Sequence, residues 1–381
     1  MKIGIDARPL IKKWGGIPRV LREILEALNR IDQVNDYFLY ANRDFELSFD
    51  NPRWHKRVDL LFSHLPGTLW LQIGARRVIL RDRPDLFWGT SQVLPLNLPS
   101  TIAKLLTIHD LVWKRHPKTT TAYDQFIQRL FTKRSIAAAD RILPPSGSTK
   151  KDILDLFGVP PEKIHVIYHG VSPKFRPYDS KYASESISSK YNLLPKYVFT
   201  VGTLEPRKNL GSLIDAFIML KKRGNFTHQL VIAGPQGWGN LKLQEKAKKE
   251  QIAPDDIRFL GFVPDEDLPL LYSGAAAFVF PTLYEGFGLP LLEAMACGTP
   301  VACSNRSSLP EIGADAAIYF NPESADEIAH AIDKLLGDQT LRQNLMQRGL
   351  QRVQQFSWDS CARKFLAAFE EIRTAETLAS R

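Results

Sequence analysis

Short apolar runs alternate with longer segments of helical periodicity along most of the chain. The runs predict buried strands, and the segments between them predict helices that cover a parallel sheet on both faces. In the first half the predicted strands are Ile3–Asp6, Tyr37–Tyr40, Asp59–Phe62, Leu86–Trp88, Ala103–Ile108, Arg141–Pro144 and His165–Tyr168. In the second half they are Val198–Gly202, Gln229–Ala233, Arg258–Leu260, Ala276–Phe280, Val301–Ser304 and Ile318–Phe320. The pattern therefore predicts an α/β protein with doubly wound sheets.

The stretch 172–196 interrupts this alternation. It is rich in Ser, Lys and Pro and lacks a sustained apolar period, which is typical of a domain boundary. A chain of 381 residues is also long for a single core. We therefore expect a Rossmann-like domain over residues 1–175 and a second one over 176–356. The two domains should face a cleft, with ligand groups offered at the carboxyl ends of strands.

The composition favours a protein of a reducing compartment. Hydrophobic residues make up 44% of the chain and charged residues 24%, which supplies enough apolar surface for two cores. The three cysteines, Cys297, Cys303 and Cys361, are odd in number and lack metal-ligand spacing. The start MKIGIDARPL does not resemble a signal peptide, and no apolar run approaches the ~20 residues of a membrane span. We expect a cytoplasmic protein, with any membrane contact peripheral.

The positive charge is concentrated in the first half of the chain. Residues 1–175 hold 27 Lys and Arg against 17 Asp and Glu, an excess of +10, whereas residues 176–381 hold 23 against 24. No aromatic-interleaved basic motif or zinc spacing supports nucleic-acid binding. Two other interpretations of this positive charge remain. One is a surface for anionic lipid or a charged acceptor, and the other is a solvated basic face over a core helix. The residues concerned are Lys12, Lys13, Leu69, Trp70, Leu71, Ile73, Arg76, Arg77, Arg81 and Arg83.

The segment PTLYEGFGLPLLEAMACGTPV, at 281–301, predicts an anion site at a helix start. It follows an apolar run that indicates a buried strand, and Pro290 stands where the first helical turn is expected. The helix should therefore begin near Gly288–Leu289. Its unpaired N–H groups and its dipole favour a phosphate, and Gly286 and Gly288 allow close approach of a ligand to the backbone.

Two carboxylates flank this helix start, Glu285 before it and Glu293 within it. Acids beside a phosphate site are unsuited to bind the phosphate itself. They are suited to accept hydrogen bonds from hydroxyl groups. One carboxylate would accept from a sugar on one side of a diphosphate, and the other from a ribose on the opposite side. Taken singly, Glu293 is also explained as a surface residue of a helix first turn and Glu285 as a solvated loop residue.

Two further segments carry groups suited to a diphosphate. In EPRKN, at 205–209, Arg207 and Lys208 follow a predicted strand, and Asn209 is expected to cap the next helix. Near the start of the chain, Gly15 and Gly16 precede a helix that should begin near 17–18 and offer bare N–H groups. Two exposed loop charges and an ordinary tight turn are the alternative explanations. No G-x-G-x-x-G string occurs, which counts against a dinucleotide oxidoreductase.

Other polar residues at strand ends are less specific. His109 and Asp110 stand where the strand Ala103–Ile108 ends, and an isolated histidine is more often structural than catalytic. Asp265 and Asp267 spell D-x-D, but they follow Pro264 and precede a helical pattern, so helix capping explains them better than a metal site. We expect no catalytic metal and no cofactor.

Six blocks in this order resemble the family 4 retaining glycosyltransferases, nucleotide-sugar enzymes of the GT-B fold. They are GGIPRV (15–20), LTIHDLVW (106–113), VIYHGVSPKF (166–175), VGTLEPRKNL (201–210), AGPQGWG (233–239) and the E-x7-E segment (285–293). The resemblance implies that Arg207 and Lys208 bind the donor diphosphate and that His109 reaches the donor sugar. With Glu285 these form the expected catalytic set. The expected donor-binding residues are Gly15, Gly16, Gly202, Val263, Gly286, Phe287, Gly288, Leu289 and Glu293, with the backbone around Val263 contacting the nucleobase.

The resemblance also implies that a last helix, over 357–381, packs back onto the first domain, and that transfer proceeds by a same-face displacement. The motif details are most similar to bacterial mannosyltransferases that use GDP-mannose in O-antigen or exopolysaccharide assembly, with a glycan or lipid-linked acceptor. One departure is that His169 to Ser172 read His-Gly-Val-Ser where the family often has Asn-Gly-Val-Asp. A UDP-sugar enzyme, a sugar-nucleotide epimerase, a phosphorylase with pyridoxal phosphate and a non-catalytic binding protein are the alternatives.

Overall fold

The computed structural model describes residues 1–239, 242–250, 253 and 255–379. Within them the chain divides into two compact units. The first comprises Met1–Arg115, Thr121–Gly170 and Ser357–Arg381, and the second comprises His116–Thr120 and Val171–Phe356. Residues 380 and 381, which end the segment expected to pack onto the first domain, lie outside the described residues.

The first unit is built on a parallel sheet that has six strands among the described residues, in the order β3-β2-β1-β4-β5-β6. The strands are β1 (Lys2–Asp6), β2 (Asp36–Ala41), β3 (Trp54–Val58), β4 (Leu86–Gly89), β5 (Ala103–Thr107) and β6 (Arg141–Leu143). The central strands are buried, as expected for a sheet that helices cover on both faces. The carboxyl ends of β1, β4 and β5 therefore lie side by side at one edge.

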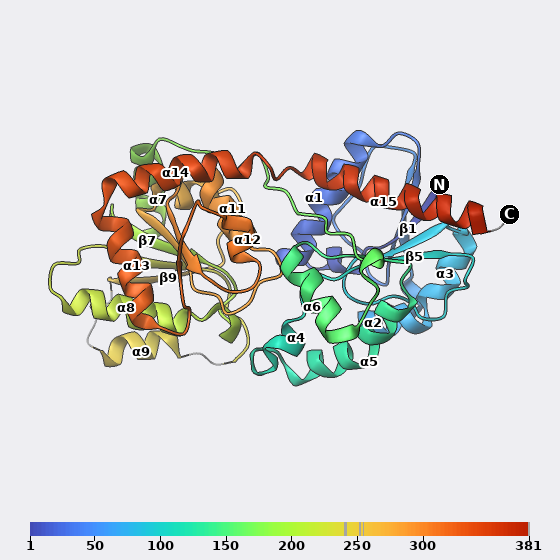
Figure 1. The fold of residues 1–381 in the computed structure, drawn as a ribbon, viewed down its shortest axis with the longest axis horizontal. Coiled ribbons are helices and arrows are strands. Elements are labelled where there is room, and N and C mark those ends of the chain that lie inside the picture. Colours follow the sequence, from blue (N-terminus) through green and yellow to red (C-terminus); the bar gives the residue numbers. More distant parts are fainter. Residues whose placement is uncertain (240–241, 251–252, 254, 380–381) are drawn as a thin grey trace. The chain divides into compact units, whose positions relative to one another are not determined.

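The helices of the first unit are α1 (Gly16–Ile31), α2 (Gly67–Ile73), α3 (Ala75–Asp82), α4 (Val112–Arg115), α5 (Ala122–Ala138), α6 (Gly147–Phe157) and α15 (Trp358–Ala379). The last of these comes from the far end of the chain and lies along α1 (Figure 1). Its rings Phe365 and Phe369 lie 4.5 and 6.1 Å from the indole of Trp88 on β4. A C-terminal segment thus completes the core of the N-terminal sheet.

The second unit repeats the architecture. Its parallel sheet has, within the described ranges, six strands in the order β12-β11-β10-β7-β8-β9. The strands are β7 (Tyr197–Val201), β8 (Gln229–Ala233), β9 (Ile257–Gly261), β10 (Ala277–Phe280), β11 (Val301–Ser304) and β12 (Ile318–Phe320). The helices are α7 (Ser180–Tyr191), α8 (Leu210–Lys222), α9 (Leu243–Lys249), α10 (Leu268–Gly274), α11 (Leu289–Ala296), α12 (Leu309–Gly313), α13 (Ala325–Gly337) and α14 (Gln339–Val353).

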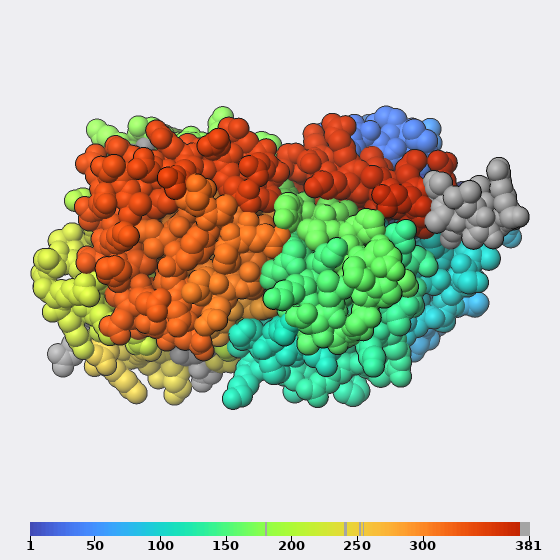
Figure 2. All heavy atoms as spheres, viewed as in Figure 1, coloured from blue at the N-terminus to red at the C-terminus, as the bar shows by residue number. Residues whose placement is uncertain are grey.

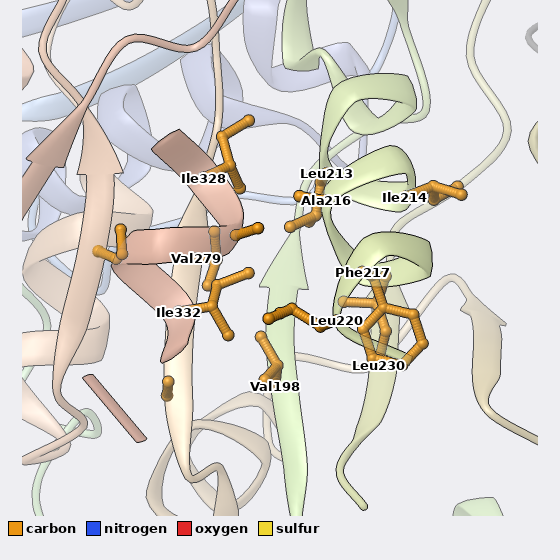
Figure 3. Packing of buried hydrophobic residues seen from close by; sticks show 14 of the residues in the cluster. Val198, Leu213, Ile214, Ala216, Phe217, Leu220, Leu230, Val279, Ile328 and Ile332 are labelled. Atoms are coloured by element: carbon orange, nitrogen blue, oxygen red, sulfur yellow. The ribbon is translucent and has the colours of Figure 1, made fainter. Parts of the chain in front are cut away.

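The core of the second unit lies between the sheet and the helix pair α8 and α13. Leu213 and Leu220 of α8 and Ile328 and Ile332 of α13 pack among the side chains of the central strands (Figure 3). These four positions are spaced by seven and four residues, so each pair lies on one face of its helix. The two doubly wound sheets confirm the α/β prediction.

The strand predicted at Asp59–Phe62 is wrong. Residues Leu60–Phe62 form a 3₁₀ turn in which Leu60 and Leu61 are largely exposed, and the strand of this region is β3. The β3 sequence, WHKRV, stands at the edge of the sheet and is only partly buried. An edge strand needs few apolar residues, because one of its edges has no neighbouring strand and faces water. The more apolar run Leu60–Phe62, which follows β3, was therefore mistaken for the strand.

The strand predicted at His165–Tyr168 is also wrong. The segment runs beside β6, and its N–H groups at His165 and Ile167 donate to the carbonyls of Ile142 and Pro144 at 3.0 Å. A single bridge, Ile142 to Ile164, is formed instead of a ladder. Pro144 and the next residue have no N–H to return, so regular pairing stops there.

The stretch 172–196, in which the domain boundary was expected, contains a regular helix, α7, which packs against α10.

The surface expected in the stretch 69–83 needs correction. In the stretch 69–83, Trp70 and Leu71 are core residues of the first unit, while Leu69 and Ile73 are exposed. Trp70 and Leu71 lie on one face of α2, and Leu69 and Ile73 lie on the opposite face. None of the described helices is both long and apolar enough to span a membrane.

Candidate functional site

Four charged side chains meet where the neighbouring strands β7 and β10 end. Lys208 Nζ lies 2.6 Å from Glu285 Oε1, and Arg207 Nη1 lies 2.8 Å from the same oxygen. Arg207 also holds Glu205, with Nη2 and Oε1 2.7 Å apart. All four side chains are largely buried, so these ion pairs are little screened by water. The carboxyl edge of the sheet therefore carries a compact cluster of two cations and two carboxylates, which we call the β7/β10 charge cluster.

The environment of this cluster changes the proton affinity of its members. The hydroxyl of Thr282 also donates to Glu285 Oε1, at 2.9 Å. Burial alone would raise the pKa of Glu285, but Arg207 and Lys208 outweigh it and hold that pKa at about 2. Burial lowers the pKa of Lys208, and Arg207 adds to that effect while Glu285 opposes it. Glu285 is therefore a carboxylate at neutral pH and acts as an acceptor.

The loops that carry the cluster are tied to each other by backbone hydrogen bonds. The N–H of Leu283 donates to the Arg207 carbonyl at 2.9 Å, and Arg207 Nη1 donates to the Tyr284 carbonyl at 2.9 Å. Asn209 stands at the N-cap of α8, as predicted, but its side chain does not cap that helix. Its amide donates to the carbonyls of Pro281 and Pro322 at 3.1 and 2.6 Å. Asn209 thus joins the two loops at the strand ends instead of capping α8.

Two serines that the sequence analysis missed support the loop from Glu285 to Gly288. The backbone N–H of Glu285 donates to Ser307 Oγ at 2.8 Å, and Ser308 Oγ donates to the carbonyls of Glu285 and Phe287 at 2.9 and 2.8 Å. Ser307 holds a left-handed backbone conformation, with φ of 51°, which is uncommon for a residue with a side chain. Both follow the buried strand β11, and polar residues directly after a buried strand are the signal that could have found them.

The helix start at Gly288–Leu289 is confirmed. Helix α11 begins at Leu289, and Gly288 occupies the N-cap with φ of 102°, a conformation open to glycine without steric cost. Glu293 is 3% exposed, so its interpretation as a surface residue is wrong. Its Oε2 accepts a hydrogen bond from the Tyr272 hydroxyl at 3.0 Å. Glu285 precedes the helix start and Glu293 lies within the helix, and the two differ in their surroundings, since Glu293 contacts Tyr272 and Glu285 lies in the charge cluster.

Gly202 shapes the surface next to the charge cluster. It stands at the end of β7 with φ of 153°, and a Cβ there would lie 3.2 Å from Lys208 Cε. The side chain of Lys208 therefore runs across bare backbone on its way to Glu285. A cavity of about 470 Å³ opens beside the ends of β8 and β9 and the start of α9, with Gly234, Gln236 and Gly261 in its lining. Val263 follows Gly261 by two residues and is buried.

In the first unit, His109 follows the end of β5. Its Nε2 lies 2.8 Å from the carbonyl of Thr90, which can only accept, so Nε2 carries the proton and Nδ1 is the free acceptor of the neutral ring. Burial lowers the pKa of His109, although the Thr90 carbonyl and Asp110 raise it. The ring of His169 lies 5.9 Å away and stacks on Trp358 at 5.8 Å. Burial, and then His109, place the pKa of His169 well below its usual range.

Gly15 and Gly16 lie where the chain enters α1. Gly15 is the N-cap with φ of 124°, and the helix begins at Gly16, one residue earlier than predicted. At the end of the neighbouring strand β1, the Asp6 carboxylate is buried and takes two hydrogen bonds from the guanidinium of Arg8, at 2.7 and 2.6 Å. Thr90, the partner of His109, donates its hydroxyl to the Asp6 carbonyl at 2.6 Å. The loops after β1, β4 and β5 thus form one connected edge.

The aspartates of the D-x-D pair are held by ion pairs. Asp265 lies 2.8 Å from Lys174, and Asp267 lies 2.6 Å from Lys190. Asp267 does occupy the N-cap of α10 but makes no capping hydrogen bond, so the capping explanation is wrong for its side chain. Over the residues that the structure describes, no three His, Cys, Asp or Glu side chains are grouped to hold a metal ion.

The structure brings together Arg207, Lys208, Glu285 and Gly202 of the predicted site residues. Gly286, Phe287, Gly288 and Leu289 follow directly as the loop and helix start beside the cluster, whereas Glu293 contacts Tyr272. His109 and the Gly15–Gly16 pair belong to the first unit. Glu205, Thr282, Ser307 and Ser308 are polar neighbours that the sequence analysis did not assign.

Models of two protein families match this chain. A model described as glycosyl transferases group 1 matches residues 184–352, and one described as glycosyltransferase family 4 matches residues 14–175. The O-antigen chain mannosyltransferase B of Escherichia coli is 35% identical over 395 residues, which cover 97% of this chain and 100% of that protein.

Solved structures show the same fold. The sucrose-phosphate synthase of Thermosynechococcus elongatus has a TM-score of 0.79 at 19% identity, over 98% of this chain and 99% of that one. HepE of Anabaena, solved in complex with UDP-glucose, has a TM-score of 0.76 at 18% identity, and each chain is covered to 100%. At this identity the likeness concerns the fold alone, and it is the GT-B fold predicted from the sequence.

The charge cluster makes the stability of the second unit depend on pH. Because the pKa of Glu285 is about 2 in the folded protein, below its ordinary 4.5, its contribution is present above pH 4.5 and is lost as the pH falls through 2. We expect Glu285→Gln to lower the free energy of unfolding at pH 7 by about 3 kcal/mol, the cost of removing one partner from a buried ion pair. The difference should shrink between pH 4.5 and 2 in urea titrations.

The matched control is Glu250→Gln, which removes an exposed carboxylate at the same 2.6 Å from its lysine, Lys222. Solvent screens that pair, so this variant should unfold like the wild type. Equal stability of Glu285→Gln and wild type at pH 7, or a difference independent of pH, would contradict the assignment.

Proposed function

The chain belongs to glycosyltransferase family 4, and on that basis we propose that it transfers mannose from GDP-mannose, with retention, to a glycan or lipid-linked saccharide acceptor. The observation that carries the proposal is the 35% identity to an O-antigen chain mannosyltransferase over 97% of the chain. Cell-surface polysaccharide assembly is the corresponding process. The enzyme would act in the cytoplasm, at the inner face of the membrane, without a cofactor or a catalytic metal.

The proposed donor-binding groups are the β7/β10 charge cluster and the start of α11. Arg207 and Lys208 can neutralise a diphosphate, the arginine through its planar fork and the lysine as a point charge. In the cluster they are already paired with Glu285, so the diphosphate must compete with that carboxylate for them. When the diphosphate takes Arg207 and Lys208, Glu285 would lose their hydrogen bonds. A sugar hydroxyl that donates to Glu285 would then replace them. This exchange would couple sugar recognition to diphosphate binding.

The remaining donor contacts are proposed from the same surface. Gly286, Phe287, Gly288 and Leu289 offer backbone N–H groups near the helix start, where the dipole favours an anion. Glu293 would accept from the ribose hydroxyls. The backbone around Val263 would contact the nucleobase, and the cavity of about 470 Å³ beside β8 and β9 offers room in that region.

The proposed reaction breaks the bond between the anomeric carbon and the phosphate oxygen and forms a bond from that carbon to the acceptor hydroxyl oxygen on the same face. The hydroxyl proton passes to an oxygen of the leaving diphosphate. Stabilisation of the leaving charge and orientation of the reactants matter more here than a strong base. His109, with its Nδ1 as acceptor, and the Gly15–Gly16 loop are proposed to contact the donor sugar and diphosphate.

A panel of GDP- and UDP-sugars tests the donor. GDP-mannose should raise the melting temperature and be hydrolysed slowly in the absence of acceptor, with retention at the anomeric carbon and without loss of rate in EDTA. If only UDP-sugars raise the melting temperature, the donor is a UDP-sugar and the assignment of GDP-mannose is wrong. Binding without any hydrolysis or transfer would indicate a binding protein, and absorbance from pyridoxal phosphate would indicate a phosphorylase.

Glu293→Gln tests the ribose contact. It should weaken binding of GDP as well as of the donor, by about 1–3 kcal/mol for a hydrogen bond to a charged group. The control is Tyr272→Phe, which removes the hydroxyl that donates to Glu293 but leaves the carboxylate. It should keep most of the GDP affinity. Isothermal titration showing equal affinity in wild type and Glu293→Gln would remove the residue from the site.

His109→Ala separates binding from turnover. If His109 contacts the sugar in the transition state, the variant should bind GDP like the wild type and lose most of its turnover of donor, because only the transition state is destabilised. His165→Ala serves as control, since this histidine is also in the first unit and forms an exposed pair with Glu371. Wild-type turnover in His109→Ala would overturn the assignment.

A further inference from the structure

The cavity beside the ends of β8 and β9 has an apolar floor. Leu204, Ile232 and Leu243 are among its lining residues, and each of them is less than a tenth exposed. Phe259 of β9 adds an aromatic ring to the same lining. The described lining residues all belong to the second unit, and the volume is about 470 Å³. The floor is therefore suited to the apolar faces of a flat ring.

Bare backbone at two strand ends keeps the cavity open. Gly234 follows β8 and Gly261 ends β9, with φ angles of 140° and 68°. A Cβ at Gly234 would lie 2.0 Å from the carbonyl oxygen of Gly202, so no side chain fits there. A Cβ at Gly261 would meet no atom within 4 Å. A ligand can therefore lie directly against the main chain at these strand ends.

The rim of the cavity carries a donor and an acceptor side by side. Lys242, the N-cap of α9, and Glu245, in its first turn, both line the cavity, and Lys242 Nζ lies 3.5 Å from Glu245 Oε2. Their side chains are 61 and 60% exposed, so a ligand can reach both groups and their mutual attraction is weak. Helix α9 is labelled in Figure 1, and its segment, in golden yellow, reaches the surface of the second unit in Figure 2.

The rim pair matches the polar edge of guanine. Resting on the proposed function, we propose that Lys242 and Glu245 select guanine as the base of the sugar nucleotide. Guanine presents an acceptor, O6, next to two donors, N1–H and the N2 amino group. Lys242 donates to O6, and the two oxygens of Glu245 accept from N1–H and from the amino group. Binding thus exchanges one weak ion pair for three charge-assisted hydrogen bonds.

The same pair disfavours uracil. The corresponding edge of uracil has a single donor, N3–H, between two carbonyl oxygens. A carboxylate that accepts from N3–H is therefore brought close to an oxygen that repels it. Ring faces and a diphosphate are common to both nucleotides, so the apolar floor and the β7/β10 charge cluster bind them alike. The rim pair, Lys242 and Glu245, therefore supplies the discrimination between the two bases.

The position of the cavity fits a nucleotide whose diphosphate lies at the β7/β10 charge cluster. In the strand order β10-β7-β8-β9, the cavity lies at the ends of the last two strands and the cluster at the ends of the first two. Two strand spacings, roughly 10 Å, separate them. A ribose and an α-phosphate bridge such a distance between a base and a β-phosphate. A single GDP group can therefore contact both features.

Isothermal titration with GDP, IDP and UDP tests the proposal. IDP is GDP without the N2 amino group, so the full chain should bind IDP about tenfold more weakly, the loss of one hydrogen bond to a charged group. Glu245→Ala should weaken GDP at least tenfold, bind GDP and IDP alike, and leave UDP binding no weaker, because the acceptor of the amino group is gone. Lys242→Gln should weaken GDP and IDP by the same factor, because both bases carry O6.

The matched controls are Glu250→Ala and Lys248→Gln, which remove an exposed acid and an exposed lysine outside the described lining of the cavity. Both should keep the wild-type affinities and the tenfold preference for GDP over IDP. All four positions are exposed, so each variant should melt at the wild-type temperature.

The outcomes separate this inference from the proposed donor. Equal affinity of the wild type for GDP and IDP, or a preference for GDP that survives Glu245→Ala, would overturn the role of the rim pair and leave GDP-mannose as the donor. Tighter binding of UDP than of GDP by the wild type would overturn the donor, and the selection of guanine with it.

Discussion

One carboxylate oxygen organises the second unit of this protein. Glu285 Oε1 receives Arg207, Lys208 and the hydroxyl of Thr282, which come from loops after two neighbouring strands. Bringing two cations together in a buried place is unfavourable unless a carboxylate compensates for their repulsion and lost hydration. The loops after β7 and β10 are therefore held to each other by charge, and the same charges are the ones suited to meet a diphosphate.

The surrounding polar groups hold that carboxylate in place. Ser307 and Ser308 bind the backbone of the loop that bears Glu285, and Asn209 joins this loop to the start of α8. The exchange of partners proposed for Glu285 would require a backbone that stays in place while the side chains move. The loop of Glu285 is held through its main chain by contacts that do not involve the ion pairs of its side chain.

The edge of the first unit combines a buried ion pair, Asp6 with Arg8, with a chain of neutral groups. Thr90 links the Asp6 carbonyl to His109, and burial keeps both His109 and His169 toward their neutral forms. The tautomer of His109 is thereby set by a backbone carbonyl. Both units thus carry buried charges at their strand ends, and the first unit also carries the neutral ring of His109.

The sequence alone determined the fold class, most strands and the helix start at Gly288–Leu289, because buried parallel strands and glycine-marked helix starts leave local patterns. It also selected Arg207, Lys208 and Glu285 as candidate site residues. It could not show that one oxygen of Glu285 binds both cations. Lys208 and Glu285 are 77 residues apart along the chain, and only the pairing of β7 with β10 brings them together. Edge strand β3, the role of Asn209 and the burial of Glu293 were likewise decided by tertiary contacts. Local patterns record how polar a residue is, whereas its partners depend on which strand ends the fold places side by side.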